Sequence, residues 1–170
     1  MPSRSEICAR IVELGIVAVI RTPTFELVAP VVEALVNGGV LAVEVTMTVP
    51  DALRALRDVH ARFGNRILLG AGTILNGPQC KAAIGAGAQY LISPITKLEI
   101  IEAAHALDKP VMLGAYTPTE AQLAHEAGAD FIKIFPADKL GPGYIKSLRA
   151  PLPHLRVFST GWRTNVPYPP

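Results

Sequence analysis

The chain has 170 residues, half of them hydrophobic and few of them aromatic, which fits a single domain with a core built mostly from Ala, Val, Ile and Leu. The net charge is only +2 and no basic run carries interleaved aromatic residues, so we do not expect a nucleic acid as partner. Cys8 and Cys80 have no Cys or His companions at metal-ligand spacing and are expected to be reduced thiols. The first residues alternate charged and apolar side chains at helical spacing, which fits neither a signal peptide nor a membrane span and favours a cytoplasmic enzyme.

Helices and strands are predicted to alternate along the chain. The opening helix is capped by Ser3 or Ser5 and ends at Gly15. Continuous apolar runs, typical of strands covered on both faces of a parallel sheet, predict strands over residues 16–20, 40–46, 66–69, 90–92, 111–113, 131–135 and 156–158. Helical spacing of apolar residues fills the intervals, over residues 25–37, 51–63, 78–86, 96–107, 119–126 and 144–149. The segment GAGT, residues 70–73, is predicted to be a tight turn.

An internal repeat predicts how these elements assemble. Phrases that begin at Asn37, Gly85 and Glu126 share one pattern, in which a helix ends in small residues and an apolar strand follows. Their spacing of roughly one βα unit favours a closed (β/α)8 barrel of the TIM-barrel type. A doubly wound sheet is the rival, but GAGT lacks the third glycine of the dinucleotide fingerprint and comes in mid-chain.

The barrel is expected to be incomplete, because only seven strands are visible and an eighth strand and helix are missing. We expect a barrel domain over residues 1–161 and an irregular proline-rich tail over residues 162–170. Three explanations stay open: the chain is truncated, its barrel closes with a partner, or its sheet stays open.

Two polar residues within apolar strands carry the chemical hypothesis. Lys133 alone would suit an edge strand that points its ammonium to solvent. Together with Glu44 it could instead form a buried ion pair, or it could attack a ketone carbonyl to form a Schiff base while Glu44 moves protons. The residues alone leave these interpretations open.

Other polar residues follow the predicted strands, at the end of a barrel where active sites lie. Arg21 could lie at the barrel rim or attract an acidic substrate. Thr73 could have a role in the site, or it could have no role beyond stabilising a turn. Further candidates at strand ends are Thr46, Ser93, Pro94, Thr160 and Gly161. The histidines are expected at the surface, at positions 60, 105, 125 and 154, and no spacing predicts a metal site.

Six strings, VAVIRT, GGVLAVEVT, LLGAGTILN, YLISP, GADFIKIFPA and FSTG, occur in an order and spacing that closely resemble the 2-dehydro-3-deoxy-6-phosphogluconate aldolases, which also act as 4-hydroxy-2-oxoglutarate aldolases. The resemblance runs from about Ile16 to Gly161. It implies a class I aldolase on a small (β/α)8 barrel, usually a homotrimer, that uses no metal or other cofactor.

The resemblance also implies roles for individual residues. It makes Lys133 the Schiff-base lysine and Glu44 the general acid/base that acts through a bound water. The remaining positions would bind substrate: Thr73 and Pro94 line the pyruvate moiety, Phe135 is an aromatic beside the lysine, Thr160 influences facial selectivity, and Arg21 matches an arginine found in many members.

The sequence departs from the family in two places. Thr48 stands where the family often has an arginine that contacts the substrate carboxylate, which leaves the substrate preference open. Gly161 is followed by Trp162, where the family has a second glycine and a phosphate-binding turn. We interpret this as a reading-frame shift that removes half of the phosphate site; resequencing the gene would test the hypothesis, and an uninterrupted frame identical to this one would contradict it.

The expected function is cleavage of a 2-keto-3-deoxy-6-phospho sugar acid to pyruvate and glyceraldehyde 3-phosphate. The expected partners are this small keto acid and, if the barrel is complete enough, two further copies of the chain in a homotrimer. A close variant would take 4-hydroxy-2-oxoglutarate or an unphosphorylated or galactonate-type substrate. A phosphate-binding barrel isomerase or epimerase is a different class, which seldom has a lone lysine in mid-strand opposite a glutamate. An inactive fragment with an exposed sheet edge is the non-enzyme alternative.

Overall fold

The structure is a computed structural model, which describes residues 2–160. Its strands form one sheet in which every neighbouring pair is parallel and the spatial order follows the chain, from β1 to β7. The strands are β1 Ala18–Ile20, β2 Ala42–Thr46, β3 Leu68–Gly72, β4 Tyr90–Ile92, β5 Val111–Ala115, β6 Phe131–Ile134 and β7 Val157–Ser159. The sequential order excludes the doubly wound rival, whose strand order reverses at a switch point.

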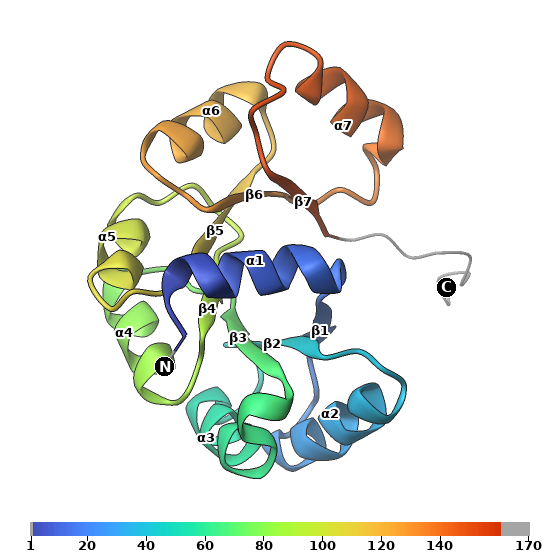
Figure 1. Cartoon of the computed structure of the whole chain (residues 1–170), viewed down its shortest axis with the longest axis vertical. Helices are drawn as coiled ribbons and strands as arrows, with labels where there is room; N and C mark the ends of the chain where they lie inside the picture. Colours follow the sequence, from blue (N-terminus) through green and yellow to red (C-terminus); the bar gives the residue numbers. More distant parts are fainter. Residues whose placement is uncertain (1, 161–170) are drawn as a thin grey trace.

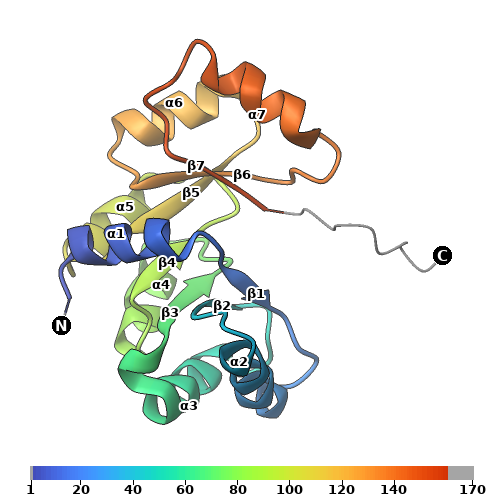
Figure 2. The ribbon, with the colours of Figure 1, turned by 45° about the vertical axis from the view of Figure 1, so that its right-hand side comes forward.

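Helices follow the strands in the alternation that the apolar spacing predicts. They are α1 Arg4–Leu14, α2 Val28–Asn37, α3 Ala52–Phe63, α4 Gly77–Gly85, α5 Glu99–His105, α6 Pro118–Glu126 and α7 Gly141–Arg149, with the short 3-10 helices η1 Phe25–Leu27 and η2 Gly64–Arg66. The sheet curls, with α2 to α7 on its outer side and α1 across its opening (Figure 1 and Figure 2). None of the helices in residues 2–160 is both long and apolar enough to cross a membrane.

The two faces of the curled sheet carry separate apolar cores, because successive side chains of a strand point to opposite faces. The outer face packs against the helices; Val43 and Val45 of β2, for example, share a core with Leu56 and Val59 of α3. The inner face carries a smaller core of Ala42, Leu68, Tyr90, Ile92, Met112 and Phe131.

Helix α1 closes the amino end of the sheet by covering this inner core. Its Ile7, Cys8 and Ile11 belong to the inner core. The helix begins with a capping box of Ser3 and Glu6 and ends at Gly15, whose φ of 68° is left-handed. This confirms the predicted opening helix and its boundaries. Cys8 and Cys80 are both free and buried.

The predicted tight turn over residues 70–73 is wrong, because Gly70 and Gly72 lie inside strand β3. A Cβ on Gly70 would overlap the ring of Tyr90, and one on Gly72 would overlap the carboxylate of Glu44. The glycines therefore make room on the inner face of the sheet rather than a turn. The left-handed residue follows the strand at Thr73, with φ of 60°.

The other predicted elements exist with small shifts in their ends. Helix α5 begins at Glu99 rather than at residue 96, and β5 extends to Ala115 rather than ending at residue 113. Strands β1 and β7 are the edges of the described sheet, which contains seven strands as predicted. Gly161 and the expected tail, residues 162–170, lie outside the described residues.

Candidate active site

Lys133 lies on the inner face of the sheet, in the middle of β6. Phe131, two residues earlier, belongs to the inner core, so Lys133 points to the same side. Strand β6 is bordered by β5 and β7, and the lysine is only 5% exposed. The edge-strand interpretation is therefore wrong. Its register neighbour on β5 is Gly114, which has no side chain, and its Nζ lies 5.1 Å from the ring centre of Phe135.

Glu44 occupies the equivalent inner position on β2, two residues after the inner-core residue Ala42. It is 1% exposed, and within residues 2–160 its Oε2 has no hydrogen-bond partner. No ion pair of 4.0 Å or less joins it to Lys133. The two residues are therefore not the contacting ion pair that was one of the open interpretations.

Burial shifts the pKa values of both groups toward their neutral forms. Burial raises the pKa of the Glu44 carboxyl, and the positive charges of Lys133 and Arg21 partly oppose that shift. Burial lowers the pKa of the Lys133 amine; the Glu44 charge opposes this shift and Arg21 adds to it. A lysine shifted in this direction is a better nucleophile, and a carboxyl shifted in this direction is more readily held as a proton donor.

Arg21 follows directly after β1, and its side chain is exposed. Its charge acts on Glu44 and Lys133, which brings it into the same site. The ends of β1 and β2 are held together here by Thr46, whose Oγ1 donates to the Ile20 carbonyl at 3.2 Å. Thr48 is exposed beside them, with its Oγ1 2.9 Å from that of Thr46.

Pro94 reaches the site through the loop after β4. A Cβ on Gly114 would overlap the Pro94 carbonyl group, so the loop lies directly on the register neighbour of Lys133. Thr96 holds the loop there by donating to the Gly114 carbonyl at 2.7 Å. Ser93 is fully buried, and its Oγ accepts from the Ile95 amide at 3.2 Å.

Thr73 combines a strained backbone with a place beside Glu44. It directly follows Gly72, the residue against which the Glu44 carboxylate packs. Its φ of 60° is rare for a β-branched residue, and such strain collects at functional sites. Thr73 is half-buried, so its side chain is partly accessible.

Lys133 lies one residue before the end of β6, and the Glu44 carboxylate packs on Gly72 at the end of β3, so the buried amine and carboxyl lie toward the carboxyl ends of the parallel strands. This is the site position of enzymes with this architecture. The family model for KDPG and KHG aldolase matches residues 7–168. The chain belongs to this family. The predicted resemblance is thereby confirmed.

Curated and solved relatives agree with this assignment. The chain is 35% identical to the 2-dehydro-3-deoxy-6-phosphogalactonate aldolase of Escherichia coli over 150 aligned residues. The aligned region covers 88% of this chain and 73% of the relative. It is 32% identical to the 2-dehydro-3-deoxy-phosphogluconate aldolase of Treponema pallidum, over 86% of this chain and 70% of the relative. The KDPG aldolase of Legionella pneumophila, solved with pyruvate as a covalent carbinolamine, superimposes with a TM-score of 0.80 at 30% identity, over 86% of this chain and 71% of that one.

Thr160 lies at the edge of the described part of this aldolase-family site. Its amide donates to the Ile134 carbonyl at 3.3 Å and its carbonyl accepts from Ala137 at 3.1 Å, which fixes it beside the end of β6. Its Oγ1 is buried and has no hydrogen-bond partner among the residues that the structure describes. Gly161, the last predicted site residue, lies outside them.

Sequence reasoning missed Tyr90, which lies next to Glu44 on the inner face. The ring is fully buried, and its hydroxyl donates to the Val43 carbonyl at 2.7 Å. Burial and the Glu44 charge raise the pKa of its phenol. The feature that could have indicated its place is a glycine on the neighbouring strand: Gly70 of β3 pairs with Tyr90 of β4 and leaves room for its ring.

The expectation for the histidines is correct for three of them. His60, His125 and His154 are exposed, but His105 is half-buried and its Nε2 lies 3.1 Å from Asp130 Oδ2. Residues 2–160 contain no group of three or more side chains placed to hold a metal ion.

Proposed function

We propose that this chain is a class I aldolase that cleaves a 2-keto-3-deoxy-6-phospho sugar acid to pyruvate and glyceraldehyde 3-phosphate. The observation that carries the proposal is the buried amine of Lys133, whose pKa is lowered, on the same inner face as the unpartnered carboxyl of Glu44. Membership of the KDPG and KHG aldolase family supports it.

In the first step, the neutral Lys133 amine adds to the C2 carbonyl carbon of the keto acid, and a proton moves from the nitrogen to the former carbonyl oxygen to give a neutral carbinolamine. The protonated Glu44 gives a proton to the departing hydroxyl, so that water leaves and a positively charged imine forms. Burial favours both starting forms, the free amine and the neutral acid.

In the second step, Glu44, now a carboxylate, removes the proton of the C4 hydroxyl, either directly or through a water. The C3–C4 bond breaks, its electron pair moves toward the imine nitrogen, and the aldehyde leaves. The resulting enamine takes a proton back at C3, and water then releases pyruvate and restores the amine. Because the charged imine is the electron sink, the proposed reaction needs no metal or other cofactor.

The other residues are proposed to hold the substrate. The exposed cation of Arg21 would attract its anionic groups. Thr73, which follows the residue that Glu44 packs on, and Pro94, which lies on the register neighbour of Lys133, would line the pyruvate moiety, with Phe135 beside the lysine. The buried Oγ1 of Thr160 would supply a hydrogen bond, and Gly161 would bind phosphate.

The wider proposal is a cytoplasmic (β/α)8-type enzyme with its domain over residues 1–161, which assembles as a homotrimer. The family resemblance supports these features. Relatives named for the galactonate acid and for the gluconate acid are similarly close, at 35% and 32% identity. The proposal therefore names the class of 6-phosphorylated keto-deoxy acids and keeps the galactonate isomer as a second substrate.

Trapping with pyruvate and borohydride tests the proposal. Borohydride reduces the imine to a stable secondary amine, so mass spectrometry of a digest should find one adduct, on Lys133. Lys139 is a matched lysine a few residues along the chain and should stay unmodified. A folded protein that gives no adduct on Lys133 would favour the inactive-fragment alternative.

A further inference from the structure

A cavity lies at the end of the sheet opposite to the proposed active site. It has a volume of 590 Å³ and is bordered by α3 and by the segments that lead into β4 and β5. Two of its lining residues, Gln89 and Lys109, stand just before those strands, at their amino ends. Its size is that of a site for a small metabolite.

The ionisable side chains that line this cavity are all basic. They are Arg57, His60 and Lys109, and no Asp or Glu is among the lining residues. Arg57 and His60 are three residues apart on α3 and therefore share one face of the helix. The ring of His60 packs on Gly87, whose φ is 107° and where a Cβ would come within 2.6 Å of His60 Cγ. This close packing keeps His60 at the cavity wall.

Lys109 is the unusual member of this basic group. It is only 7% exposed, and its ammonium has no hydrogen bond or ion pair within residues 2–160. Its stem is buried, but its Nζ is not among the buried, unpartnered nitrogen and oxygen atoms of residues 2–160, so the ammonium keeps access to the cavity. The ammonium therefore lines the cavity without a counter-charge among the described residues, and a bound anion would supply one.

The ordinary explanation for basic residues at this end is that they complement the carbonyl ends of helices. It accounts for His60, in the last turn of α3. It does not account for Lys109, because the Ala104 carbonyl at the end of α5 already accepts from the Lys109 backbone amide at 3.0 Å and the side chain makes no hydrogen bond there.

We propose that this cavity binds a small anion through a phosphate or carboxylate group. Lys109 is the anchor in the cavity wall, Arg57 supplies a two-pronged donor, and His60 adds a further donor. Ile84 and the small glycine and alanine residues 85–88 form the apolar wall against which the body of a metabolite packs. The site is separate from the aldolase site, so the inference does not rest on the proposed function.

Calorimetric titration of the full chain tests this site, with inorganic phosphate and citrate as probes. Lys109→Met should weaken binding of the preferred probe by about 10- to 100-fold, and Arg57→Gln by about tenfold. Lys81→Met is the control, since Lys81 lines a different cavity together with Glu99 and Glu102, and it should leave affinity unchanged. Phosphate that binds more tightly than citrate identifies a phosphate site, and the reverse identifies a carboxylate site.

Lys133→Met separates this cavity from the aldolase site, because it removes the cation at the opposite end. Anion binding that survives Lys133→Met and is lost in Lys109→Met supports the proposal. The reverse pattern, or no heat from either probe with the unmodified chain, overturns it. Thermal unfolding reports whether Lys109→Met is folded. If it is unfolded, the test uses the exposed residues Arg57 and His60 instead, and unchanged affinity for the probe in both Arg57→Gln and His60→Gln overturns the proposal.

Discussion

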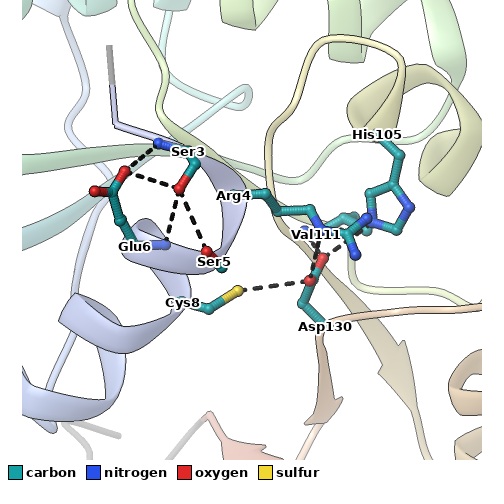
Figure 3. A network of polar contacts seen from close by, with 8 residues as sticks. All are labelled: Ser3, Arg4, Ser5, Glu6, Cys8, His105, Val111 and Asp130. Carbon is teal, nitrogen blue, oxygen red and sulfur yellow. Dashed lines mark hydrogen bonds and ion pairs between the residues drawn. The ribbon is translucent and has the colours of Figure 1, made fainter.

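Two carboxyl groups toward opposite ends of the sheet, the partly buried Asp130 and the buried Glu44, are held in very different ways. Asp130, just before β6, is surrounded by partners (Figure 3). It accepts from the Val111 amide at 2.9 Å and lies 3.3 Å from Arg4 Nε, 3.1 Å from His105 Nε2 and 3.5 Å from Cys8 Sγ. Glu44, on β2, has one oxygen with no hydrogen-bond partner among the described residues.

The difference separates a structural region from a chemical one. A buried polar group that finds its partners contributes to stability, and Asp130 joins α1 to the starts of β5 and β6 in this way. A buried polar group without partners costs free energy, and such costs persist where a site needs the group for another purpose. The strained backbone of Thr73 lies at the same end as Glu44, which fits this division.

Lys133→Met should cause the largest loss of aldolase activity. The variant lacks the nucleophile, so we expect aldolase activity to fall by about 10⁴-fold or more. The free energy of unfolding should stay level or rise, because an apolar side chain replaces a buried amine. Steady-state kinetics with a 6-phosphorylated keto-deoxy acid, together with urea unfolding, measures both. A variant that keeps more than a tenth of the activity would remove Lys133 from the mechanism.

Glu44→Gln should have the next largest effect. We expect kcat to fall by about 10²- to 10⁴-fold, since the amide cannot exchange protons. Borohydride trapping on Lys133 should still occur, because the nucleophile remains. The comparison of turnover with trapping tests the role, and an unchanged kcat would contradict it.

The same variant should change how stability depends on pH. Because burial raises the pKa of Glu44, the folded chain binds this proton more tightly than the unfolded chain does. The contribution of Glu44 to stability is therefore full below the ordinary value of 4.5 and is lost as pH rises through the raised value. The unfolding free energy of Glu44→Gln relative to the unmodified chain should thus grow from pH 4 toward neutrality. A difference that stays constant with pH would show that the folded pKa is not raised.

Asp130→Ala should lower the stability of the fold and leave the activity unchanged. It leaves Arg4, His105 and the Val111 amide without their shared acceptor, so we expect a loss of about 3 kcal/mol in unfolding free energy. Activity per folded molecule should not change, because the network lies at the far end of the sheet. Asp58→Ala is the control: its ion pair with Arg62 is exposed, and its loss should cost less than about 1 kcal/mol. Equal costs for the two variants would contradict the structural role of Asp130.

The features that could be predicted from the sequence are those with a local signal. Apolar runs and helical spacing located the strands and helices, and a lysine and a glutamate inside apolar strands are unusual enough to indicate the reacting pair. The family strings added the roles of Arg21, Thr73 and Pro94, which remain predictions.

The features that could not be predicted depend on residues far apart in the chain. Gly70 and Gly72 look like a turn until Tyr90 and Glu44 are known to occupy the space beside them. The contacts of Asp130 could not be predicted from the sequence, because its partner Cys8 is 122 residues away along the chain. Whether Lys133 was exposed or buried depended likewise on β7 pairing along β6, which its own strand does not reveal.

Tyr90→Phe should have the smallest effect and tests how separate the two ends are, because Tyr90 packs in the inner core beneath α1 and also lies near Glu44. Loss of its hydroxyl leaves the buried Val43 carbonyl without this donor, so we expect a cost of about 1 kcal/mol. Since the hydroxyl donates to Val43 rather than to Glu44, kcat should change by less than about threefold. Tyr144→Phe is the matched control, with an exposed hydroxyl that donates to the Tyr116 carbonyl at 2.6 Å, and should cost less than about 0.5 kcal/mol. A large fall in kcat for Tyr90→Phe would mean that the inner core positions Glu44 and that the two ends are coupled.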